Sequence, residues 1–151
     1  MPPIALALGS NLGNRAAHLD WAVSRLRAFI DGLVVSPYVE TAPVGVEHHP
    51  DYLNAAAVGH TELPPRALLE ALLTLEAERG RERTTGVTPR PLDIDLILYG
   101  EMTIDEPGLS VPHPRFRERA FVLEPLAALA PSMIDPVTGR TIAQLAAALE
   151  S

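Results

Sequence analysis

The sequence predicts an α+β protein with a ferredoxin-like βαββαβ core, an antiparallel sheet with helices, and helical additions at the C-terminus. The main observation is the order of its apolar patterns, which runs strand, helix, strand, strand, helix, strand. In such a core both helices cover one face of the sheet, the first and third strands lie at its centre, and the other face is left for ligands. The 151 residues, 47% hydrophobic and 21% charged, predict a single globular domain over residues 1–151.

The first half of the chain supplies the first three strands and the first helix. The apolar stretch 3–9 predicts a strand that ends at a glycine, and Asn14 is a suitable cap for the helix that follows. Gly32 is expected to end that helix, and the stretches 33–41 and 52–60 predict two further strands. The apolar residues at helical spacing in the first helix are Leu19, Ala22, Val23, Leu26, Phe29 and Ile30.

The second helix opens at Pro64-Pro65 and closes at Gly80. Its apolar side is formed by Leu68, Leu69, Leu72, Leu73 and Leu75. After the next strand come a short strand over 109–111, a helix over 120–130 and a C-terminal helix over 141–150. These last elements are expected to cover what the core leaves open.

The stretch TPRPLDIDLILYG, residues 88–100, places two carboxylates at the start of an apolar strand. Side chains alternate along a strand, so Asp93 and Asp95 share one face with Ile97. The other face is expected to carry Leu92, Ile94, Leu96 and Leu98. A solvated strand face would explain the two acids, but Ile97 continues their face and favours the mouth of a partly covered cleft. Neighbouring carboxylates in such a place suit a bound Mg²⁺.

The charged residues limit the chemistry. All 12 basic residues are arginine, and the absence of lysine excludes a P-loop, a protein kinase and a Schiff-base enzyme. Seven arginines lie between residues 79 and 119, while the formal charge of −7 arises elsewhere in the chain. This distribution favours a local anion pocket over a nucleic-acid surface. No apolar run has the length of a membrane span, and we expect a cytoplasmic protein without membrane or nucleic-acid partners.

Two connections, 42–51 and 80–91, are longer than turns. The second carries arginines and precedes the two aspartates, an arrangement that suits phosphoryl transfer. We predict that both segments are mobile in the free protein and become ordered when Mg²⁺, nucleotide and the second substrate are bound. Trp21, the single tryptophan, lies on the predicted first helix and is expected to report poorly on the arginine segment.

Six motifs in order resemble one family: LGSNLGNR, TAPVG, PDYLNAA, GRER, PRPLDIDLIL and VPHPRFRERAFVLEPL. The chain is similar in these motifs to the 6-hydroxymethyl-7,8-dihydropterin pyrophosphokinase family of folate biosynthesis. The resemblance implies transfer of pyrophosphate from ATP to the pterin alcohol, with AMP and the pterin diphosphate as products. It also implies two Mg²⁺ ions, ATP as co-substrate and small-molecule partners, and we expect a monomer.

The resemblance carries roles to individual residues. It implies catalytic roles for Arg81, Arg90, Asp93 and Asp95, with both aspartates as metal ligands. The ATP-binding residues that it implies are Glu76, Arg83, Leu96, Ser110, His113 and Arg119. The pterin-binding residues that it implies are Thr41, Val44, Tyr52, Asn54 and Phe121, of which the two aromatic residues would stack on the ring and the amide would read its edge. Gly9, Ser10 and Asn11 are interpreted as close-packing and loop-holding residues.

The chain departs from the family pattern in two places. Many relatives carry a tryptophan shortly before the Pro-Arg of the signature, where this chain reads GVTPR, and Pro114 replaces an aromatic residue that often follows the histidine. Three alternatives remain open at the sequence level. A nucleotidyltransferase with a DxD strand would release pyrophosphate, a non-catalytic effector-binding ferredoxin-like module would need no metal pair, and an aldolase of the same pathway would share only the pterin pocket.

Overall fold

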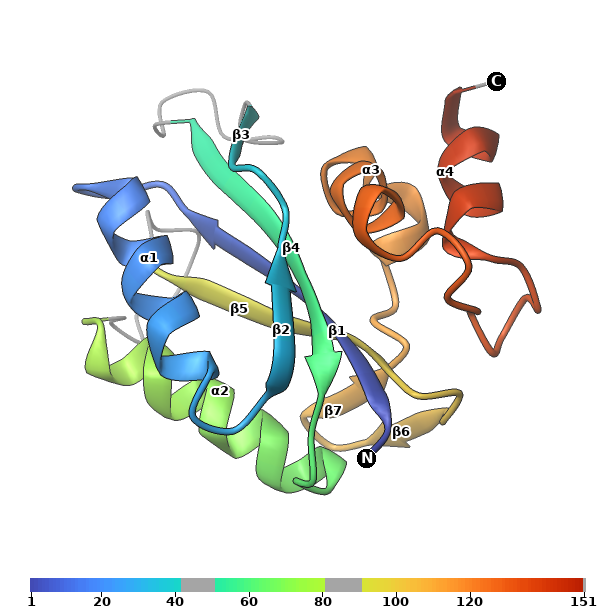
Figure 1. Cartoon of the computed structure of the whole chain (residues 1–151), viewed down its shortest axis with the longest axis horizontal. Helices are drawn as coiled ribbons and strands as arrows, with labels where there is room; N and C mark the ends of the chain where they lie inside the picture. Colours follow the sequence, from blue (N-terminus) through green and yellow to red (C-terminus); the bar gives the residue numbers. More distant parts are fainter. Residues whose placement is uncertain (42–50, 81–90, 151) are drawn as a thin grey trace.

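A computed structural model describes residues 1–41, 51–80 and 91–150, and the backbone in it forms a five-stranded antiparallel sheet (Figure 1). Its strands are β1 (Pro3–Ser10), β2 (Asp31–Val35), β3 (Val39–Thr41), β4 (Tyr52–His60) and β5 (Asp93–Tyr99). They lie in the order β2-β4-β1-β5, and β3 pairs with the first three residues of β4. The strands predicted first and third, β1 and β4, therefore lie at the centre, and β5 lies next to β1 as predicted.

Helices lie on both faces of this sheet (Figure 1). One face packs against α1 (Arg15–Leu26) and α2 (Pro65–Glu78) through a core that includes Leu6, Leu19 and Leu72, all fully buried. The other face packs against α3 (Ala120–Leu129) and α4 (Ile142–Glu150) around Phe116 and Leu123. The C-terminal helices thus cover part of the face that carries the aspartates.

The first helix ends at Leu26, so the prediction that it continues to Gly32 was wrong. Residues 27–29 form a turn, and the Ile30 amide donates to the Leu26 carbonyl at 2.9 Å. Ile30 is buried beneath Gly59 of β4, where an added Cβ would lie only 2.5 Å from its Cγ2. Gly32 lies inside β2 at a register shift, with the positive φ of +63° that glycine adopts readily.

The alternation predicted for β5 holds as far as Leu96 and fails at Leu98. Leu96 pairs with Leu6, but Leu98 pairs with the adjacent Ala5, so β5 contains one extra residue. This bulge turns Leu98 to the face of α3 and α4, where it packs beside Ile97. Tyr99 takes the opposite face, and its hydroxyl donates to the carbonyl of Leu63.

The chain after β5 forms a hairpin of β6 (Ile104–Glu106) and β7 (Leu109–Val111), followed by a 3₁₀ turn, η1 (Phe116–Glu118). The strand over 109–111 was predicted, whereas its partner β6 was not. Beyond α3, the buried carboxylate of Asp135 accepts two hydrogen bonds from Arg117, at 2.6 and 2.8 Å, and fixes the loop before α4. Among the described helices, none has the length and apolar composition needed to cross a membrane.

Candidate active site

The register of the sheet brings the predicted pterin and metal residues onto one face. Gly9 of β1 pairs with Asn54 on one side and with Asp93 on the other. Two residues before Gly9, and on the same face of β1, Ala7 pairs with Ala56 and Asp95. Directly paired residues share a face, so the aspartates and the amide stand on either side of a floor of glycine and alanine. The predicted metal and pterin residues are thus separated by the width of one strand, β1.

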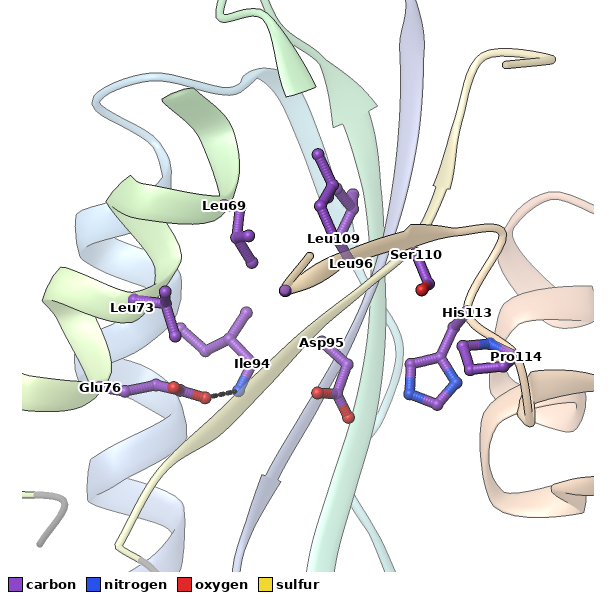
Figure 2. Close-up of a pocket in the computed structure, with 11 residues that line it drawn as sticks. Leu69, Leu73, Glu76, Ile94, Asp95, Leu96, Leu109, Ser110, His113 and Pro114 are labelled. Carbon is purple, nitrogen blue, oxygen red and sulfur yellow. Dashed lines mark hydrogen bonds between the residues drawn. The ribbon is translucent and has the colours of Figure 1, made fainter. Parts of the chain in front are cut away.

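A pocket lies beside the same end of β5, the edge strand of the sheet (Figure 2). One wall comes from α2 and the other from β7 and the residues after it. Figure 2 shows the Asp95 carboxylate pointing into the space between these two walls. The lining residues are Leu69, Leu73, Glu76, Ile94, Asp95, Leu96, Gly108, Leu109, Ser110, His113 and Pro114. Four predicted ATP-binding residues, Glu76, Leu96, Ser110 and His113, are therefore brought together with a predicted metal ligand.

Sequence reasoning missed several residues of this lining. Leu69 and Leu73 were placed only on the core side of the second helix, yet both line the pocket and Leu73 is 41% exposed. The signal was present, because five leucines at adjacent helical positions make a stripe wider than one packed face needs. Gly108 and Leu109 gave no such signal.

Glu76 joins α2 to the strand that carries the aspartates. Its side chain is buried, and Oε2 accepts a hydrogen bond from the backbone amide of Ile94 at 2.8 Å. A carboxylate that accepts an amide hydrogen bond satisfies a backbone group at the exposed edge of the sheet. Glu76 thus fixes the α2 wall of the pocket to β5 as well as lining the pocket.

His113 lies opposite Glu76 and is held in one tautomer. Its backbone amide donates to Ile97 at 3.0 Å, and its Nδ1 accepts from the Arg115 amide at 3.2 Å. Burial lowers the pKa of the imidazole, and the guanidinium groups of Arg119 and Arg115 lower it further. The neutral ring therefore offers its Nε2–H as a donor, and the two arginines beside it provide positive charge for an anion.

Phe121, a predicted stacking residue, lies beside Arg119, a predicted phosphate contact. Phe121 lies in the first turn of α3, packs against the core formed with that helix and is only partly buried. The Arg119 guanidinium lies 5.7 Å from the centre of its ring. A predicted phosphate contact and a predicted stacking residue are therefore neighbours.

The predicted pterin residues Thr41, Tyr52 and Asn54 lie at the β3–β4 pairing. Thr41 pairs with Tyr52, and Asn54 Nδ2 donates to Thr41 Oγ1. The Asn54 side chain is buried and its orientation is fixed by this bond. An amide held in this way can read the edge of a heterocycle without losing rotamer freedom on binding.

Gly9, interpreted from the sequence as a close-packing residue, has that role beside Asn54 and Tyr52. A Cβ at this position would lie 3.3 Å from Asn54 Oδ1 and 3.7 Å from Tyr52 Cδ1. We expect Gly9→Ala to weaken pterin binding by about 10-fold, since a methyl group would push the amide from its fixed place. Calorimetry with the pterin would measure this. Ala7→Gly, which also changes one methyl on β1, is the control, and equal losses in both variants would contradict the role.

Arg15, at the start of α1, contacts residues on both sides of the segment 42–50. Its guanidinium donates to the Asp51 carbonyl at 2.9 Å and forms an ion pair with Glu40, which precedes Thr41. We expect Arg15→Met to weaken pterin binding by about 5-fold and to leave nucleotide binding unchanged, because only the β3–β4 end loses a contact. Titrations of the two ligands would separate the effects, and an equal loss for both would contradict this assignment.

Four predicted site residues, Val44, Arg81, Arg83 and Arg90, lie outside the described residues, as do most of the segments 42–51 and 80–91. Among the described residues no group of three or more His, Asp or Glu side chains is arranged to hold a metal. Asp93 and Asp95 still fit Mg²⁺, which in phosphoryl-transfer sites takes one or two carboxylates and completes its shell with phosphate oxygens and water.

Known proteins resemble this chain over most of its length. The family model for 7,8-dihydro-6-hydroxymethylpterin-pyrophosphokinase (HPPK) matches residues 5–131. A 2-amino-4-hydroxy-6-hydroxymethyldihydropteridine pyrophosphokinase of Pseudomonas aeruginosa is 40% identical over 147 residues, which cover 96% of this chain and 90% of that protein. The protein of the same name from Methylorubrum extorquens is 41% identical, with 96% and 92% covered.

Other relatives are longer. The mitochondrial folate synthesis bifunctional protein of Arabidopsis thaliana is 42% identical over 135 residues, which are 87% of this chain and only 24% of that protein. The crystal structure of Plasmodium falciparum HPPK-DHPS shares the fold, with a TM-score of 0.78 at 15% identity, and this chain spans 44% of it. The family model and the two bacterial relatives cover most of the sequence, and the chain belongs to the 7,8-dihydro-6-hydroxymethylpterin-pyrophosphokinase family.

Proposed function

We propose that this chain transfers the terminal diphosphate of ATP to 6-hydroxymethyl-7,8-dihydropterin in folate biosynthesis. The hydroxymethyl oxygen would attack the β-phosphorus, the bond from that phosphorus to the α–β bridging oxygen would break, and AMP would leave. The hydroxyl proton would pass to solvent. The observation that carries the proposal is that Asp95 lines the pocket at the edge of β5, while Asp93, on the same face of that strand, pairs with Gly9, which in turn pairs with Asn54.

Two Mg²⁺ ions held by Asp93 and Asp95 would neutralise the phosphates and orient the attacking oxygen. The protein would supply the aligned carboxylates, since β5 fixes both on one face and Glu76 fixes the edge of that strand. His113 Nε2–H and Arg119 would contact phosphate oxygens. Leu96 and Ser110 would border the nucleotide. The catalytic roles of Arg81 and Arg90 and the phosphate contact of Arg83 stay predictions from the family resemblance.

On the pterin side, Tyr52 and Phe121 would stack on the ring, and Asn54, held by Thr41, would read its edge. Val44 would complete the pocket. We assign the core to the ferredoxin-like class, with the C-terminal helices as additions, on the strength of the strand order. We further propose one domain over residues 1–151, acting as a monomer in the cytoplasm.

The test is to incubate the protein with ATP, Mg²⁺ and 6-hydroxymethyl-7,8-dihydropterin and to identify the nucleotide product by chromatography. We expect AMP in equal amount to the pterin diphosphate, and neither without Mg²⁺. ADP would contradict diphosphate transfer. Free pyrophosphate together with a nucleotidylated product would instead support a nucleotidyltransferase.

A further inference from the structure

His18, which has no part in the site described above, connects two elements near it. His18 is half-buried on α1, and its Nδ1 accepts a hydrogen bond from Arg79 Nε at 2.8 Å. Arg79 is the C-terminal capping residue of α2, one turn after Glu76. On the other side of the ring, Nε2 faces the turn after β1, where a Cβ on Gly13 would lie 3.3 Å away, and the ring hydrogen-bonds to the backbone of Leu12.

Arg79 is also packed against Trp21, one turn further along α1. The guanidinium groups of Arg25 and Arg79 each lie 5.1 Å from the centre of the Trp21 ring. Arg25 in turn donates to the Glu78 carboxylate at 2.8 Å. The last turn of α2 is thus fixed to α1 by an ion pair, a cation–π contact and the bond to His18. Trp21 thus contacts the residue that ends α2, whereas the segment 80–91, on which it is expected to report poorly, lies mostly outside the described residues.

The bond between His18 and Arg79 exists only for a neutral imidazole. Nδ1 must carry a lone pair to accept from Arg79, and a proton there would place two cations in contact. Burial lowers the pKa of His18, and the Arg79 charge lowers it further, while the bond to Leu12 acts in the opposite direction. Arg79 is the charged group that α2 presents to the ring. The turn before α1, residues 11–14, contains no charged residue, and Arg25 and Glu78 are paired with each other.

We propose that His18 is a positioning residue for the nucleotide site: through Arg79 it holds the last turn of α2, and with it Glu76, in place while its ring is neutral. Glu76 fixes α2 to the aspartate strand through Ile94, and His18 fixes the same turn to α1. Because the neutral ring is favoured in the folded protein, this contact is present above the ordinary histidine pKa of about 6.5 and is lost as pH falls through the lower folded value.

The inference rests on the proposed nucleotide site, and its test compares variants across pH. The variant His18→Asn keeps an acceptor near the Nδ1 position and cannot be protonated, whereas His18→Leu removes the acceptor. His60→Asn, at an exposed histidine at the far end of β4, is the matched control. Calorimetry would give the affinity for α,β-methylene-ATP with Mg²⁺ between pH 8 and pH 5.5. Protonation of the analogue and of His113 affects all variants alike, so the ratio of affinities isolates His18.

We expect the wild type and His18→Asn to bind the nucleotide analogue equally at pH 8. At pH 5.5 the wild type should bind it about 5-fold more weakly than His18→Asn, a factor at the low end of the range for coupling between sites. His18→Leu should bind about 5-fold more weakly than the wild type at pH 8. The His60→Asn variant should follow the wild type, and pterin affinity should not distinguish the variants. A constant ratio of wild type to His18→Asn over the whole range would overturn the proposal.

A measurement without ligand separates this proposal from the proposed function. Trp21 emission should titrate in the free wild type with a midpoint below pH 6.5 and should not do so in His18→Asn or in Arg79→Met. Identical titration curves in all three proteins would overturn the proposal even if the nucleotide binds normally. If the wild type bound no nucleotide at pH 8 while Trp21 titrated as expected, the positioning contact would stand and the nucleotide site would fail.

Discussion

Asp95→Asn is expected to lower turnover at saturating substrates by at least about 100-fold, because neutralisation of the phosphates by metal supplies several kcal/mol of transition-state stabilisation. The substitution keeps the shape of the side chain and removes one charge from the pocket wall. Pterin affinity in the absence of nucleotide should change little, since Asn54 and Tyr52 stand on the other side of β1. Steady-state kinetics with varied Mg²⁺ would measure the loss.

The matched control is Asp31→Asn, at an exposed aspartate of β2 on the opposite edge of the sheet. This variant should keep normal turnover. If Asp95→Asn also kept near-normal turnover at saturating Mg²⁺, the two aspartates would be residues of a solvated strand face and the metal assignment would be lost.

Tyr52→Ala and Phe121→Ala should each weaken pterin binding by roughly 1 to 3 kcal/mol, the range measured when aromatic side chains stack on nucleobases. Nucleotide affinity should be unchanged for Tyr52→Ala, because the β3–β4 end does not border the pocket beside β5. For Phe121→Ala we also expect a small effect on nucleotide, since Arg119 rests near that ring.

Fluorescence or calorimetric titration with the pterin would measure both losses. Tyr52→Phe, which keeps the ring, should bind the pterin nearly as well as the wild type. Equal losses of pterin and nucleotide affinity in Tyr52→Ala would show that the side chain supports the fold instead of stacking on the ligand.

The parts of the fold that were predicted correctly depend on local patterns. Strand β4 and helix α2 begin and end close to the predicted positions, because alternating or helical apolar spacing is bounded by Pro64-Pro65 and Gly80. The C-terminal helices were predicted from the same signal. In each case the apolar spacing that predicts the element and the residues that mark its ends are close together in the sequence.

The errors have a common physical origin in contacts between distant residues. Phe29 and Ile30 fit a helix by period, yet Thr61 Oγ1 donates to the Phe29 carbonyl at 2.9 Å and Ile30 packs against Gly59, so both leave the helix. The bulge at Ile97 depends on the register with β1 and has no sequence signal of its own. A single-residue slip of this kind reverses the face of every later side chain.

Individual residues of the candidate site were predicted only where they belong to a motif shared with the family. The pairing of Gly9 with both Asn54 and Asp93 could not be read from one strand, since register is set by the whole sheet. The contact from His18 to Arg79 joins residues 61 positions apart and belongs to no motif. Sequence patterns therefore gave the chemistry of the site, and the sheet register gave the reason that its residues meet.

Transfer of label from ATP tests the central claim most directly. ATP labelled with ³²P at the β-phosphorus would be incubated with Mg²⁺, 6-hydroxymethyl-7,8-dihydropterin and the protein, and the products would be separated. We predict that the label appears in the pterin diphosphate, with AMP unlabelled. Label in ADP beside an unlabelled pterin monophosphate, or in free pyrophosphate, would contradict diphosphate transfer at the Asp93–Asp95 strand.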